Sequence, residues 1–120
     1  MENNNKTVCD LIMEGISYFN KRDISSALKC FKQVHIMGFS DIVIFYIAII
    51  ARLNNNEAMA ILNQLANNGN PNAQRELGIC YYVGMGVVQD IEESYKLWEK
   101  AAENGDEFSK IRINEYKIKN

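Results

Sequence analysis

The chain has 120 residues, a length that suits one ordinary domain with a real core but not two. Apolar residues make up 48% and charged residues 23%, as in globular proteins, which argues against general disorder. The net charge of −2 provides no basic excess, which argues against nucleic acid as a partner.

The N-terminal segment and the cysteines indicate a cellular location. We expect residues 1–6 to form a disordered polar tail, with a single helical domain over residues 7–120. No basic region followed by an apolar stretch is visible, so we expect no signal peptide. Cys9, Cys30 and Cys80 contain no C-x-x-C pair, which is typical of free thiols in a reducing compartment. We therefore expect a cytoplasmic protein.

Three glycines divide the sequence at regular intervals. Gly38, Gly69 and Gly105 lie 31 and 36 residues apart, and each follows a periodic apolar segment, where the C′ position of a helix favours glycine. A period in this range is typical of an array of helical hairpins. We predict an all-α fold with hairpins over about 8–37, 41–68 and 71–105.

The first hairpin has small residues on both helices. Gly15 and Ala27 lie on the two apolar stripes, so the helices can approach closely. The polar break between the stripes ends at Asp23, which we expect to be an N-cap.

The second hairpin begins with an apolar run over residues 42–51. The run is about half the ~20 residues that a membrane-spanning helix needs, so we expect a buried helix and no membrane association. Its many β-branched residues leave a strand as an alternative. The array context favours the helix.

The third hairpin has the clearest helix signals. We expect Asn70 to cap a helix that has Pro71 in its first turn. Asp90 is expected to cap the returning helix, with Glu93 three residues later as in a capping box.

The connector of the third hairpin contains Gly84 and Gly86, a pairing also used by phosphate-binding loops. A P-loop requires Lys followed by Ser or Thr after its last glycine, and neither pair follows Gly86. A dinucleotide-binding loop requires glycine at position 89, which is Gln89. We predict instead that both glycines adopt positive φ in a turn between helices.

The C-terminal segment repeats the start of the third hairpin. A shift of 36 residues places Ala73 on Ser109 and the end of the second hairpin on residues 102–105. Residues 107–118 are therefore predicted to begin a fourth repeat and to form a capping helix. The alternation over residues 110–113 leaves a strand or a frayed end as alternatives.

The third hairpin resembles a Sel-one-like repeat, a relative of the tetratricopeptide repeat. The residues that carry the resemblance are Ala73, Leu77, Gly78, Tyr81, Gly84, Gly86, Val87, Asp90, Trp98, Ala101, Ala102 and Gly105. Ser94 stands where the family prefers alanine. The resemblance implies a right-handed α/α solenoid with a concave groove, here about three hairpins plus a C-terminal capping helix. It implies binding of proteins or peptides and no reaction.

Residues suited to catalysis or metal binding are few. His35 is the sole histidine, and zinc needs three or four convergent ligands. The acidic residues Glu14, Glu92 and Glu93 fit capping or solvated roles. We predict no catalytic site, no metal site and no cofactor, and a protein that is not an enzyme.

The groove follows from the resemblance, because the first helix of each tetratricopeptide-like hairpin lines the concave side. Carried over to this chain, the groove residues are Ile12, Ile16, Phe19, Phe45, Ile49, Arg52, Asn72, Arg75, Ile79 and Tyr82. Two interpretations remain open. Either these side chains bury one another in a short array, or they form an open apolar groove with Arg52, Arg75 and Tyr82 as polar anchors.

The functional hypothesis is a non-enzymatic protein–protein interaction module, a small cytosolic adaptor or inhibitor whose partner is a protein or peptide. The alternative is an immunity protein that neutralises a bacterial toxin by tight one-to-one binding. The Asn-, Lys- and Ile-rich composition is typical of an AT-rich genome and favours a bacterial source. The sequence contains no signal that indicates a particular oligomeric state.

Overall fold

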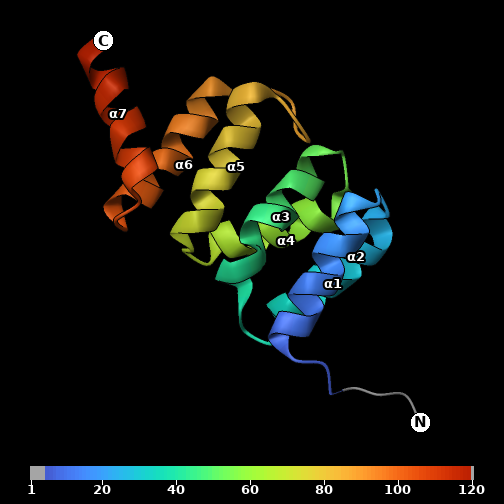
Figure 1. Cartoon of the computed structure of the whole chain (residues 1–120). Helices are drawn as coiled ribbons and strands as arrows, with labels where there is room; N and C mark the ends of the chain where they lie inside the picture. Colours follow the sequence, from blue (N-terminus) through green and yellow to red (C-terminus); the bar gives the residue numbers. More distant parts are fainter. Residues whose placement is uncertain (1–4, 120) are drawn as a thin grey trace. The chain divides into compact units, whose positions relative to one another are not determined.

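The computed structural model describes residues 5–119, and within that range it contains seven α-helices and no strand (Figure 1). The helices are α1 (Val8–Asn20), α2 (Ile24–Ile36), α3 (Ser40–Arg52), α4 (Asn56–Asn67), α5 (Pro71–Val83), α6 (Ile91–Glu103) and α7 (Glu107–Lys119). The prediction of an all-α helical-repeat fold is confirmed. The disordered tail was predicted over residues 1–6, of which residues 1–4 lie outside the described residues.

The chain divides into two compact units, Met1–Ile47 and Ala48–Asn120, with α3 contributing to both. Each unit is described by itself below. The expectation of one continuous domain over residues 7–120 stays a prediction.

Two segments that could have been strands are helices. In α3, Ile44 and Ile47 are buried while Phe45 is exposed, so the helix has a distinct inner face although its sequence is apolar all round. In α7, the buried residues Ser109 and Ile113 lie four apart, which is the spacing of one helical face. The alternation over residues 110–113 is therefore not a strand pattern.

Most helices begin with the same side-chain cap. Asp23, Asn55, Asn70 and Asp90 each accept a hydrogen bond from the backbone N–H three residues later, at 2.9–3.2 Å. The capping-box prediction at Asp90 is wrong, because its own N–H donates to the carbonyl of Tyr81 at 2.9 Å rather than to Glu93. This bond ties the start of α6 to α5.

The helix ends also follow the predicted pattern. Gly38, Gly69 and Gly105 have φ of 95°, 91° and 94°, in the left-handed region that favours glycine at C′. Gly84 and Gly86 have φ of 73° and 81°, as predicted for a turn. The connector between α5 and α6 is not a phosphate-binding loop, because it joins two helices rather than a strand and a helix.

Position 86 also has no room for a side chain. A Cβ at this position would lie 2.5 Å from the carbonyl oxygen of Ala51 and 2.8 Å from the terminal methyl of Met59. The connector of the third hairpin therefore packs directly on the end of α3 and on α4.

Both units use a glycine to admit a large aromatic side chain between two helices. In the first unit, a Cβ on Gly15 would lie 2.6 Å from the ring of Phe31, which is fully buried. In the second unit, a Cβ on Gly78 of α5 would lie 2.7 Å from Cδ1 of Trp98 on α6. Trp98 is 1% exposed, so its ring lies in the core. In Figure 1, α5, α6 and α7 follow one another as neighbours, and α5 also packs on α4.

Candidate partner-binding site

The predicted groove residues fall in both units, and the two sets are considered separately. Ile12, Ile16, Phe19 and Phe45 belong to the first unit. Ile49, Arg52, Asn72, Arg75, Ile79 and Tyr82 belong to the second.

In the first unit, two of the predicted residues contact the ring of Tyr46. Ile12, Ile16 and Phe19 are half-buried, and Phe19 meets the ring of Tyr46 edge-on at 5.9 Å between centroids. Phe45 is 56% exposed and also contacts Tyr46, at 5.7 Å. These residues form a partly open aromatic surface.

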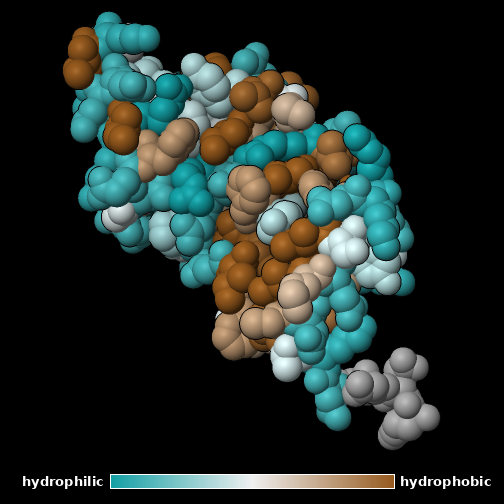
Figure 2. Space-filling model, viewed as in Figure 1, coloured by the Kyte–Doolittle hydropathy of each residue, from teal (hydrophilic) through white to brown (hydrophobic). Residues whose placement is uncertain are grey.

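That surface continues toward the start of α3. Figure 2 shows apolar residues gathered over this segment. The exposed apolar side chains there are Ile36, Met37, Phe39, Ile42 and Phe45.

In the second unit, the two predicted arginine anchors are engaged within the chain. Arg52 donates from Nη2 to Glu76 Oε1 at 2.7 Å, and their side chains are 15% and 7% exposed. Arg75 donates from Nη1 to Asp106 Oδ1 at 2.6 Å and approaches Glu76 Oε2 at 3.4 Å. The resulting chain of charges, Arg52–Glu76–Arg75–Asp106, links the end of α3 to α5 and to the start of α7. Asn72 joins it by accepting a bond from Arg75 at 3.0 Å.

The carboxylate at the end of this chain is stabilised in its ionised form. Burial acts to raise the pKa of Asp106, but hydrogen bonds from Ser109 and from Arg75 outweigh it, so the pKa lies below its ordinary value. Ser109 donates from both its backbone N–H and its hydroxyl, at 3.0 and 2.7 Å. Asp106 thus caps α7 and holds Arg75 at the same time. Partner binding by Arg52 and Arg75 stays a prediction, and their geometry fits a structural role.

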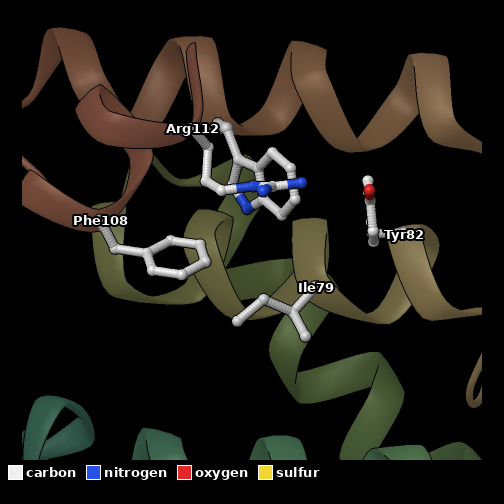
Figure 3. Close-up of a pocket in the computed structure, with 5 residues that line it drawn as sticks. Ile79, Tyr82, Phe108 and Arg112 are labelled. Carbon is white, nitrogen blue, oxygen red and sulfur yellow. The ribbon is translucent and has the colours of Figure 1, made fainter. Parts of the chain in front are cut away.

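An open pocket of about 260 Å³ lies beside α5, where two of the predicted groove residues meet α6 and α7. Its walls are Ile79, Tyr82, Trp98, Phe108 and Arg112. In the close-up of Figure 3, Phe108, Ile79 and Tyr82 surround the hollow, and Arg112 reaches across it. Ile79 and Tyr82 were predicted from the sequence, whereas Phe108 and Arg112 were not.

Arg112 lies among aromatic rings. Its guanidinium carbon is 4.8 Å from the centroid of Tyr82, 5.0 Å from that of Trp98 and 6.0 Å from that of Tyr95. These distances are those of cation–π contacts. Burial acts to lower the pKa of Arg112, but interactions with Tyr82, Tyr95 and Glu115 raise it above its ordinary value. The group therefore carries its positive charge throughout the accessible pH range.

The sequence did contain a signal for Arg112. The same 36-residue shift that aligned the repeats places Arg112 on Glu76, which lies on the inner side of α5 and is 6% exposed. Because the alternation of residues 110–113 also fits a strand, the sequence alone does not assign Arg112 to the inner face of a helix.

His35, Cys30 and Cys80 occupy structural positions. His35 Nδ1, on α2, lies 2.7 Å from the hydroxyl of Ser40, the first residue of α3. Burial raises the pKa of the Cys30 and Cys80 thiols, which remain protonated near neutral pH. Among residues 5–119, no group of three or more potential ligands is placed to hold a metal ion. Over the same residues, no helix has the length and apolarity needed to cross a membrane.

Repeated caps, glycine-terminated helices and the glycine–aromatic contact define this chain as a protein of helical repeats. Residues 71–106 match the family model described as Sel1 repeat, which covers α5, the connector and α6. The resemblance predicted for this hairpin is confirmed, and the chain carries a Sel1 repeat. Such repeats generally mediate protein–protein interaction as non-catalytic scaffolds. No curated protein and no solved structure matched the chain in the same comparisons.

Proposed function

We propose that this chain is a non-enzymatic protein-binding module, a small adaptor or inhibitor, and that the pocket beside α5 is the centre of its binding surface. The observation that carries the proposal is this open pocket, whose walls are mostly aromatic. It lies on the side of α5 where the Sel1 resemblance implies a groove.

The composition of the pocket supports a protein partner. Tyr, Trp and Arg are the residue types that most often dominate the binding energy of protein interfaces. Tyr82 and Phe108 are 36% and 42% exposed, so a partner can contact them without unfolding the hairpin. A volume of about 260 Å³ suits one or two side chains, below the ~300–1,000 Å³ of typical small-molecule sites.

The test is quantitative capture from an extract of the source cells, with the wild type and two variants as bait. Tyr82→Ala removes a wall of the pocket. Tyr18→Ala is the matched control, because Tyr18 is equally exposed at 37% but lies on α1. We expect a partner that is retained by wild type and by Tyr18→Ala and lost with Tyr82→Ala.

Calorimetry on the captured partner then separates the two forms of the proposal. One partner bound one-to-one at nanomolar affinity indicates an inhibitor, including the immunity protein of a toxin. Several partners at micromolar affinity indicate an adaptor. Binding that is insensitive to Tyr82→Ala, or the absence of any retained protein, contradicts the proposal for this pocket.

A further inference from the structure

The pocket combines apolar walls with a single positive charge, and this combination specifies what it can bind. We infer that it accepts a large apolar side chain of a partner that has a carboxylate beside it, and that Arg112 binds this carboxylate. The inference rests on the proposed function and names the chemistry of the partner segment.

The walls determine the apolar part of the ligand. Ile79 and Phe108 provide hydrocarbon surface, and the rings of Tyr82 and Trp98 lie 5.5 Å apart between centroids. A branched aliphatic or aromatic group inserted here replaces water at the surfaces of Tyr82 and Phe108, which are otherwise partly exposed. Apolar character alone does not distinguish among such side chains, so selectivity must come from a polar neighbour.

Arg112 is the charged residue among those that line the pocket. Its guanidinium carbon lies over the rings of Tyr82 and Trp98, and its N–H groups are the donors available for hydrogen bonds. It donates from Nη1 to Glu115 Oε1 at 3.2 Å and from Nη2 to the Tyr95 hydroxyl at 3.4 Å. A guanidinium has five N–H donors, so it can bind an incoming carboxylate in addition to these partners.

The carboxylate that Arg112 already contacts is easily displaced. The side chain of Glu115 is 55% exposed and lies three residues from Arg112 on the same helix, and exposed pairs of this kind contribute little. Arg75 differs, since the side chain of its partner Asp106 is 7% exposed and Ser109 holds that carboxylate in place. Of the two arginines, Arg112 is the one whose charge a partner can use.

The test uses small probes and needs no identified partner. The probes are 3-phenylpropionate, which joins a ring to a carboxylate, its neutral amide 3-phenylpropanamide, and acetate. Binding is followed by NMR at the indole N–H of Trp98, the sole tryptophan of the chain. We expect millimolar binding of 3-phenylpropionate, roughly 3- to 10-fold tighter than the amide, and weaker binding of acetate.

Two variants have opposite expected effects. Arg112→Gln abolishes the preference for the acid over the amide and leaves amide binding in place. Glu115→Gln removes the competing carboxylate and strengthens 3-phenylpropionate binding about two- to fivefold without changing amide binding. If Arg112→Gln does not fold, two other measurements still test whether Arg112 binds the carboxylate. These are the effect of Glu115→Gln and the salt dependence of the wild-type preference for 3-phenylpropionate over its amide.

Equal binding of acid and amide to the wild type overturns the inference, and so does the absence of any binding. Either result leaves the capture experiment with Tyr82→Ala standing as the test of the proposed function. Conversely, a preference for the acid without a captured partner supports the pocket chemistry and contradicts the protein-binding proposal.

Discussion

Gly78 offers the most direct test of how α5 packs on α6. It lies inside α5 with ordinary helical backbone, so an alanine there is compatible with the backbone itself. The added methyl group, however, would lie 2.7 Å from Cδ1 and 3.0 Å from Cε2 of Trp98. Trp98 is 1% exposed and is held by a hydrogen bond from its indole N–H to the carbonyl of Arg75 at 3.1 Å, so it has little room to retreat.

The size of the effect follows from two opposing contributions. Overpacking a filled core costs about 1–3 kcal/mol, while replacing glycine by alanine inside a helix returns up to about 1 kcal/mol. We therefore expect Gly78→Ala to lower the free energy of unfolding by about 1–2 kcal/mol. For a chain of 120 residues this corresponds to a fall in Tm of about 4–8 °C.

The measurement is thermal and urea unfolding followed by circular dichroism, with Trp98→Phe as the partner substitution. The smaller ring makes room for the new methyl group, so the double variant should lose less stability than the sum of the two single variants, by about 1 kcal/mol. A Gly78→Ala protein as stable as the wild type, or more stable, would refute this account of the α5–α6 contact.

Three further outcomes are expected. Trp98→Ala should cost about 3–5 kcal/mol in urea unfolding, because it empties a filled core site; an unchanged midpoint would place Trp98 outside the core. The folded-state pKa of Asp106 lies below the ordinary 3.8. The ionised Asp106 therefore contributes fully to the free energy of unfolding above pH 3.8, and this contribution is lost as pH falls through the folded-state pKa. The difference in Tm between wild type and Asp106→Asn should therefore narrow below about pH 3.8. A difference that does not change with pH would argue against a lowered pKa of Asp106 in the folded state. Ellman's reagent should label Cys9 rapidly and the buried Cys30 and Cys80 only on unfolding; fast labelling of all three would contradict their burial.

Features set by local chemistry were predictable from the sequence. The caps at Asp23 and Asn70 and the left-handed Gly84 and Gly86 were all predicted and are present. Each depends on residue type and on neighbours within a few positions, which a single sequence displays directly.

Features set by distant contacts were harder to predict. The sequence placed Arg75 on the groove side of α5, but its pairing with Asp106 spans 31 residues and depends on where α7 begins. The capping box at Asp90 failed for a similar reason, since its N–H donates to Tyr81 on the preceding helix. The N-cap half of the motif is present at Asp90, and a tertiary hydrogen bond replaces the other half.

The helix–strand ambiguity of residues 42–51 has a different origin. An all-apolar run has no polar face from which a period can be read, and β-branched residues favour a strand. Only the packing distinguishes a helix from a strand here. It buries Ile44 and Ile47 and leaves Phe45 exposed.

The chain of charges from Arg52 to Asp106 has a consequence for how this protein can diverge among relatives. Glu76 is shared by two arginines, so its replacement by a neutral residue leaves Arg52 without a carboxylate in a half-buried place, although Arg75 keeps Asp106. Loss of either arginine leaves Glu76 paired with the other. Substitutions at these positions should therefore covary, with Glu76 changing last. Homologues that lack the acid at position 76 are expected to lack at least one of the arginines as well.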